Sequence, residues 1–294
     1  MTIIAREAAF MTQEIEEVRV PPGDEIAEAC RLREQALLCL DQGRYDEAER
    51  LLLRALAISE ECLGPDHLDV ASILNGLGVL HKYQGRYGEA EPLYRRALDI
   101  VDAVLGHDHP EAAGLYHNLG GLEHARGRAA EGEAPARWGL RIRERELGPD
   151  HPDVAADKAA LAAILDAQGR FAEAEELYGQ ALAVFERVYG PEHYEIAVNL
   201  NNLAAIHQAR GEAAEAERLY LRTLAIKEKV LGPDHPDLAM TLHNLATLLA
   251  GLGRSAEAKA LYRRALDIFE RTLGAEHPHS LICRGCYEEA GASS

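Results

Sequence analysis

Aromatic residues make up only 5% of this 294-residue chain, and Trp138 is its only tryptophan. No alternating Val/Ile/Thr stretch predicts a strand, whereas the apolar residues recur at helical spacing. The chain lacks an apolar run of about 20 residues, which excludes a membrane-spanning helix. Residues 1–20 lack the apolar core of a signal peptide. We therefore expect an all-α protein located in the cytoplasm.

Cysteine and positive charge are also scarce. Five scattered cysteines are too few for a disulfide framework. Cys283 and Cys286 form one C-x-x-C pair near His277 and His279, but a single pair is weak evidence for zinc. We expect a capping helix there and no cofactor. The net charge of -18 argues against nucleic acid, whose phosphates need a basic stripe, so we expect no nucleic-acid partner.

One loop returns six times at a spacing of 42 residues, first as LGPDH at residues 63–67. A fixed period of this size predicts a solenoid of stacked units. A second glycine marker, first at Gly43, divides each period into two helices. The glycine of the loop, first Gly64, is expected to end a helix in a left-handed conformation. Pro110, Pro152 and Pro236 are expected to open helices. We interpret the loop histidines as linker or capping residues.

Residues 200–236 resemble a known family. The resemblance rests on Leu200, Asn201, Asn202, Leu203, Ala204, Gly211, Ala216, Glu217, Leu219, Tyr220, Ile226 and the sequence LGPDHP at 231–236. They resemble the tetratricopeptide repeat of the kinesin light chain type, which has a 42-residue period, and the resemblance covers residues 28–280. It implies a right-handed α-solenoid of tandem helix-turn-helix repeats. A bacterial source is expected.

The predicted organisation is a single array with two flanking segments. Residues 1–23 form an N-terminal extension, within which residues 3–19 are either a capping helix or a frayed one. Residues 24–277 form six tandem repeats, and residues 278–294 form a C-terminal capping helix and tail. In the resembling family the first helices line a concave groove. Here those helices carry a total charge of +1, so we expect a nearly neutral groove inside an acidic shell.

Residues 42 apart form columns along the predicted groove, and two of these columns are rich in asparagine. Because one carboxamide both donates and accepts hydrogen bonds, these asparagines are predicted to grip the backbone of an extended peptide. Histidine, lysine and tyrosine side chains nearby would add selectivity. The alternative is that each Asn satisfies groups of neighbouring helices. The predicted peptide-binding residues are Asn75, Lys82, Tyr83, His117, Asn118, His124, Asn201, Asn202, His243 and Asn244.

The resemblance therefore favours a protein–protein interaction module or adaptor that binds a peptide or a partner protein. The alternative function is a small-molecule or enzymatic pocket at the centre of the groove around His117, His124 and Asp166. No nucleophile elbow, phosphate loop or H-E-x-x-H motif accompanies these residues. We therefore predict a protein that is not an enzyme, with no catalytic residue and no metal ligand.

The third and fourth repeats depart from the pattern. Gly132 and Gly139 replace alanines of the other second helices, and Pro135 lies inside the helix, so this helix is expected to be weakened. Ala159 and Ala160 then stand where other repeats carry Asn. Three interpretations stay open for this region. They are a pocket for one bulky ligand residue, a hinge between residues 24–146 and 147–290, and sequence drift.

Overall fold

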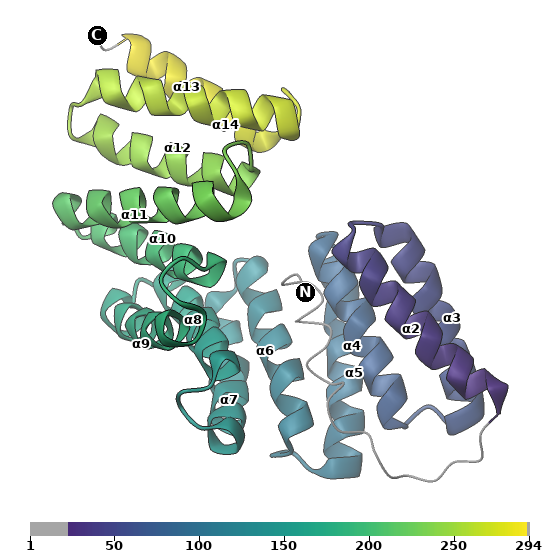
Figure 1. The fold of residues 1–294 in the computed structure, drawn as a ribbon. Helices are drawn as coiled ribbons and strands as arrows, with labels where there is room; N and C mark the ends of the chain where they lie inside the picture. Colours follow the sequence, from purple (N-terminus) through teal and green to yellow (C-terminus); the bar gives the residue numbers. More distant parts are fainter. Residues whose placement is uncertain (1–22, 293–294) are drawn as a thin grey trace. The chain divides into compact units, whose positions relative to one another are not determined.

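The computed structural model describes residues 23–292, which form thirteen α-helices and no strand (Figure 1). The helix considered for residues 3–19 lies outside the described residues. First and second helices alternate along the chain. The first helices are α2 (Asp24–Asp41), α4 (Leu68–Tyr83), α6 (Pro110–Ala125), α8 (Pro152–Ala167), α10 (Tyr194–Ala209) and α12 (Pro236–Gly251). The second helices are α3 (Tyr45–Leu63), α5 (Tyr87–Leu105), α7 (Ala129–Leu147), α9 (Phe171–Tyr189), α11 (Ala213–Leu231) and α13 (Ser255–Thr272).

One further helix, α14 (Pro278–Ala292), follows the six pairs. Its first residue lies 42 residues after Pro236, so α14 stands where a seventh first helix would begin. Inside α14, Cys283 is fully buried and burial raises the pKa of its thiol to about 12. This cysteine is therefore held as a neutral thiol within the packing of α13 and α14.

The chain divides into two compact units that meet between Gly169 and Arg170. The described part of unit 1 contains α2 to α8, and unit 2 contains α9 to α14. Within each unit, neighbouring helices in the sequence pack against one another, and first helices also touch the next first helix, as α6 does α8. This packing confirms the predicted all-α solenoid of tandem helix pairs. The boundary falls after α8, not between residues 146 and 147.

The histidine that ends each loop caps the helix that follows it. The Nδ1 atom of His67 accepts a hydrogen bond of 3.1 Å from the backbone N–H of Asp69. The bond satisfies an N–H group that has no partner inside the helix, and it requires an unprotonated Nδ1. The capping interpretation is thus confirmed. Equivalent bonds of 3.1 to 3.3 Å are made by His109, His151, His193, His235 and His277.

The second helix of the third repeat corrects an expectation. Despite its glycines and proline, α7 runs for 19 residues without a break, as α5 does. The glycines serve close packing against α6. A Cβ atom at Gly132 would lie 2.7 Å from the backbone oxygen of Gly120, and one at Gly139 would lie 2.8 Å from that of Ala113. The lost side chains are therefore compensated by a closer approach of the two helices.

Candidate functional site

Two of the predicted groove asparagines are buried inside unit 1. Asn75 on α4 and Asn118 on α6 have no exposed surface, and the Asn118 amide Nδ2 donates a 2.8 Å hydrogen bond to Asn75 Oδ1. These carboxamides join adjacent repeats. Their burial does not match the expectation that they face a peptide, because a ligand would first have to break this bond.

A third asparagine of the predicted set, Asn202, forms a hydrogen bond with a buried tyrosine. The Asn202 amide Nδ2 on α10 donates to the phenolic oxygen of Tyr178 on α9 at 3.1 Å. Tyr178 is only 1% exposed, so its hydroxyl needs a partner within the protein. The bond gives Asn202 a structural role. It fits the alternative expectation for these asparagines, in which each satisfies groups of neighbouring helices.

The sequence carries this pairing in several repeats at a spacing of 24 residues. Tyr is accompanied by Asn, while the repeat that has Ala136 in place of Tyr has Ala160 in place of Asn. At the first occurrence of this spacing, Leu52 stands in place of Tyr and Gly76 in place of Asn. A Cβ atom on Gly76 would be in contact with the Leu52 side chain. The interrupted asparagine column thus follows the loss of the tyrosine, which gives a physical reason for Ala160. Tyr and Asn stand at this spacing at Tyr94 and Asn118, Tyr178 and Asn202, and Tyr220 and Asn244. In the last of these the Tyr220 hydroxyl donates to Gln208 Oε1 at 3.1 Å instead.

Unit 2 contains partly exposed polar residues on its first helices. Asn201 on α10 and Asn244 and His243 on α12 are all half-buried. Asn201 Oδ1 accepts a 3.3 Å bond from the Thr241 hydroxyl, which leaves the Asn201 amide as a donor. The His243 ring lies 5.3 Å from the Tyr262 ring, and burial together with His279 lowers the pKa of His243.

Lys82, His124 and Asp166 come from α4, α6 and α8 and interact electrostatically in unit 1. Burial lowers the pKa of His124, Lys82 lowers it further, and Asp166 opposes this. Burial also raises the pKa of Asp166. Gly121 makes room for the lysine, since a Cβ there would lie 3.3 Å from Lys82 Nζ. The lysine ammonium lies 5.8 Å from the ring centroid of Tyr83, which is 36% exposed.

His117 belongs to a buried ionic cluster that the sequence interpretation missed. Its Nδ1 lies 2.7 Å from Asp157 Oδ1, and the same oxygen accepts a 2.5 Å bond from Arg143 on α7. The Asp157 side chain is 2% exposed and that of Arg143 is 7% exposed. A signal existed in the columns: the preceding repeat has the apolar pair Val101 and Leu115 at the positions of Arg143 and Asp157.

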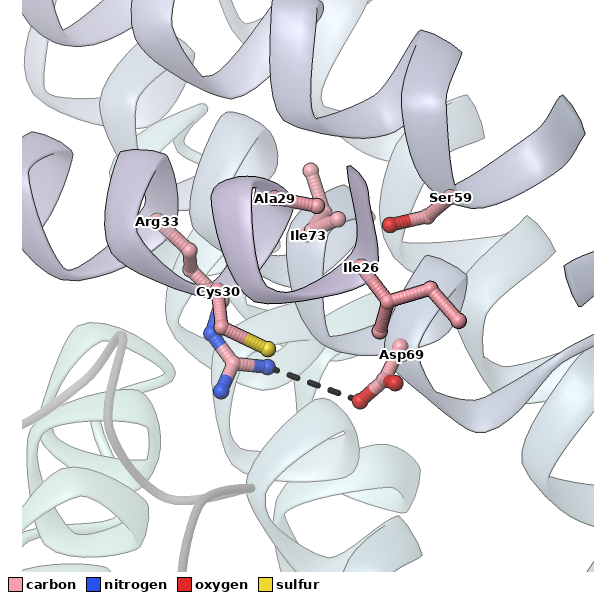
Figure 2. Close-up of a pocket in the computed structure, with 7 residues that line it drawn as sticks. All are labelled: Ile26, Ala29, Cys30, Arg33, Ser59, Asp69 and Ile73. Carbon is pink, nitrogen blue, oxygen red and sulfur yellow. Dashed lines mark ion pairs between the residues drawn. The ribbon is translucent and has the colours of Figure 1, made fainter. Parts of the chain in front are cut away.

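A small cavity lies elsewhere in unit 1, between α2, α3 and α4 (Figure 2). Arg33, which lies 42 residues before Asn75 in the sequence, lines it and points toward Asp69 at 3.8 Å. Arg33 Nη1 also donates to the Ser72 hydroxyl at 3.1 Å. The arginine is thus engaged by α4. The other lining residues are Ile26, Ala29, Cys30, Ser59 and Ile73.

The family is defined by matches along most of the chain. The tetratricopeptide repeat model matches residues 28–103, 69–145, 139–187, 154–229, 195–271 and 237–287. The chain therefore belongs to the tetratricopeptide repeat family. No curated protein matches it. None of the described helices is both long enough and apolar enough to span a membrane.

Solved structures of similar proteins include kinesin light chain relatives. BtubC (BKLC) from P. vanneervenii is 26% identical over 87% of this chain and 93% of its own, with a TM-score of 0.60. A Podosopora anserina putative kinesin light chain with nearly identical repeats is 27% identical over 70% of this chain and 98% of its own, with a TM-score of 0.58. The quorum sensor NprR from B. thuringiensis, at 15% identity over 90% of this chain and 70% of its own, shares the fold with a TM-score of 0.69.

Proposed function

We propose that this protein is an interaction module that binds an extended peptide or a segment of a partner protein along its first helices. Membership of the tetratricopeptide repeat family supports a binding role over catalysis. In each unit, the partly exposed residues of the predicted set would form a contact surface. In unit 1 these are Lys82, Tyr83, His117 and His124, and in unit 2 Asn201, His243 and Asn244. A cytoplasmic location stays a prediction from the sequence.

One observation carries the proposal. The pair Asn75 and Asn118 recurs exactly three repeats later as Asn201 and Asn244. In unit 1 the two carboxamides are fully buried and bonded to each other, whereas in unit 2 both are half-buried. The pair in unit 2 can therefore offer donors and acceptors to a peptide backbone without loss of an Asn–Asn bond. Unit 2 is the proposed site of backbone binding.

Photo-crosslinking locates the contact surface. Benzoylphenylalanine at Ala205, which is half-buried on α10 between Asn201 and Gln208, samples the proposed surface. The same group at Leu221, which is 52% exposed on α11, samples the other helix layer. We expect a partner segment to crosslink from position 205 and not from position 221. Crosslinking mainly from position 221 would overturn the proposed location.

The segment recovered in this way then serves for calorimetry. The double variant Asn201→Ala and Asn244→Ala should weaken its affinity at least tenfold, because two bidentate backbone contacts are lost. Gln180→Ala removes an exposed carboxamide from α9 and is the matched control. Equal affinities for all three proteins would refute the backbone clamp.

A further inference from the structure

The outer side of α7 carries a row of exposed arginines. Arg137, Arg141 and Arg145 are spaced four residues apart, so they lie on one face of the helix. Their side chains are 45%, 60% and 50% exposed. The opposite side of α7 is buried against its neighbours in unit 1. We call these three residues the arginine stripe.

The arginine stripe is unusual within the repeats. At the central position of the stripe, α5 has Asp99 and α13 has Asp267, while α9 and α11 have alanines. No other second helix combines three cations at these three positions. The whole chain has a net charge of -18, and each stripe arginine has an acidic neighbour: Glu133 for Arg137, Asp108 for Arg141 and Glu146 for Arg145. These ion pairs are exposed and contribute little to stability, so the carboxylates of a partner can replace them.

An aromatic cluster holds the central arginine of the stripe. The guanidinium carbon of Arg141 lies 3.6 Å from the centre of the Trp138 ring. Trp138 lies 5.0 Å from the ring of His107 and 6.4 Å from that of Tyr116. The Tyr116 hydroxyl in turn contacts His107 Nδ1 at 3.0 Å. A planar guanidinium stacked on an aromatic ring keeps its N–H groups available at its edges.

All the aromatic members are departures from the repeat. Where this repeat has Trp138, others have Arg96 and Arg222, which form ion pairs with Glu60 and Glu186 of the preceding repeat. His107 replaces a loop proline. An ion pair between repeats has therefore been exchanged for an aromatic platform under an exposed arginine.

The outer arginines are also held in place. Arg137 Nε donates to Glu133 at 2.8 Å, and Arg145 Nη2 donates to the backbone oxygen of Asp108 at 2.5 Å. Ordering three arginines before binding reduces the entropy that a ligand must overcome. Trp, Tyr and Arg are the side chains that most often dominate the energy of protein interfaces.

We propose that the arginine stripe is a second interaction surface, which binds an acidic helix of a partner protein. Carboxylates at every fourth residue of such a helix repeat at about the pitch of an α-helix, roughly 5.4 Å, which is also the spacing of the stripe. Each arginine can bind a carboxylate through two N–H groups. A long polyanion fits less well, because the acidic remainder of the chain repels it.

The unique tryptophan makes the test direct. A 16-residue helical peptide with Glu at positions i, i+4 and i+8 is titrated into the full chain while the fluorescence of Trp138 is recorded. The same peptide with Gln in place of Glu is the control ligand. We expect the Glu peptide to change the Trp138 emission saturably, and the Gln peptide to leave it unchanged at the same concentrations.

Variants then distinguish binding at the arginine stripe from a general effect of the charge of the protein. With a labelled Glu peptide and anisotropy as the readout, Arg141→Gln should weaken binding at least fivefold. Arg95→Gln is the matched control, since Arg95 is 65% exposed on α5 and its replacement removes the same charge from the preceding second helix. An equal loss in both variants, equal binding of the Gln peptide, or tighter binding of a dT20 oligonucleotide would overturn the proposal. None of these outcomes tests the peptide-binding surface that we propose on the first helices.

Discussion

Asn202 of α10 donates a side-chain hydrogen bond to the hydroxyl of Tyr178 on α9, and this bond joins the first helix of the fifth repeat to the second helix of the fourth within unit 2. The tyrosine is almost completely buried, whereas the asparagine is half-buried. The Asn202 amide therefore provides a hydrogen-bond donor for a buried hydroxyl, although Asn202 itself lies on the surface that was predicted to bind a peptide. The two roles, packing and recognition, are divided among asparagines that look equivalent in the sequence.

Asn202→Ala is expected to lower the free energy of unfolding by about 1 to 3 kcal/mol, because it leaves the buried Tyr178 hydroxyl without its partner. Urea unfolding followed by circular dichroism measures this change. In the background Tyr178→Phe the same substitution should cost much less. Additive effects of the two substitutions would show that the bond contributes nothing.

Asn244→Ala is the contrasting variant. The side chain is half-buried and we expect its loss to change the unfolding free energy by less than about 0.5 kcal/mol, as for surface substitutions generally. The same urea experiment serves for comparison with Asn202→Ala. A loss as large as that of Asn202→Ala would assign Asn244 to packing and remove it from the proposed peptide surface.

Asp157→Ala should destabilise unit 1 by about 3 to 5 kcal/mol, since it leaves the buried Arg143 guanidinium without its carboxylate. The chain itself supplies the compensated variant. Replacing Arg143 by Val and Asp157 by Leu restores the residues that Val101 and Leu115 place at these positions one repeat earlier. This double variant should melt at or near the wild-type temperature in calorimetry. A double variant as unstable as Asp157→Ala would mean that the ion pair is required.

His151→Ala should cost about 0.5 to 2 kcal/mol, because the N–H of Asp153 loses the Nδ1 acceptor that caps α8. His151→Asn should retain most of the stability, since Asn is among the best capping residues. Thermal unfolding of the three proteins checks the order. Equal stability of the Ala and Asn variants would show that the cap is dispensable.

Stability should fall as the pH drops below about 6.5, the ordinary value for histidine. Burial lowers the pKa of His124 and His243 in the folded chain, so the unfolded chain binds protons first and is favoured by acid. The loss is at most about 1.4 kcal/mol per histidine at one pH unit below that value. Lys82 and His279 lower the pKa of His124 and His243 respectively, and Asp166 raises that of His124.

Urea unfolding at pH 7.5 and 5.5 tests this dependence. The variant His124→Gln combined with His243→Gln should lose less stability between the two pH values than the wild type does. An unchanged difference would place the acid sensitivity in other groups.

Much of the fold could be predicted because it repeats. The 42-residue spacing, the loop glycines and the prolines at Pro110, Pro152 and Pro236 act locally, and each is seen in the helix boundaries. The capping histidines could also be predicted, since a cap involves only a residue and the backbone two positions on. Lys82, His124 and Asp166 stand 42 residues apart in the sequence, which is why they meet on successive first helices.

The prediction of the site was less accurate for a physical reason. Whether an asparagine in a first helix faces solvent depends on how closely the neighbouring repeat packs against it, and that packing involves residues 24 to 43 positions away. Asn118 is hydrogen-bonded to Asn75, and Asn202 is hydrogen-bonded to Tyr178. Tyr178 and Asn202, like Arg143 and Asp157, are present in the sequence, yet only contact between helices shows that they are pairs.

The sequence by itself determined the architecture: an all-α array of helix pairs with the period, caps and turns of a tetratricopeptide repeat protein, all of which arise from short-range interactions. Only the tertiary structure decided which polar residues are available to a partner. It buried Asn75 and Asn118, left Asn201 and Asn244 half-buried, and stacked Arg141 on Trp138. Exposure is a property of packed surfaces, and so it depends on residues from separate repeats that the chain brings together only on folding.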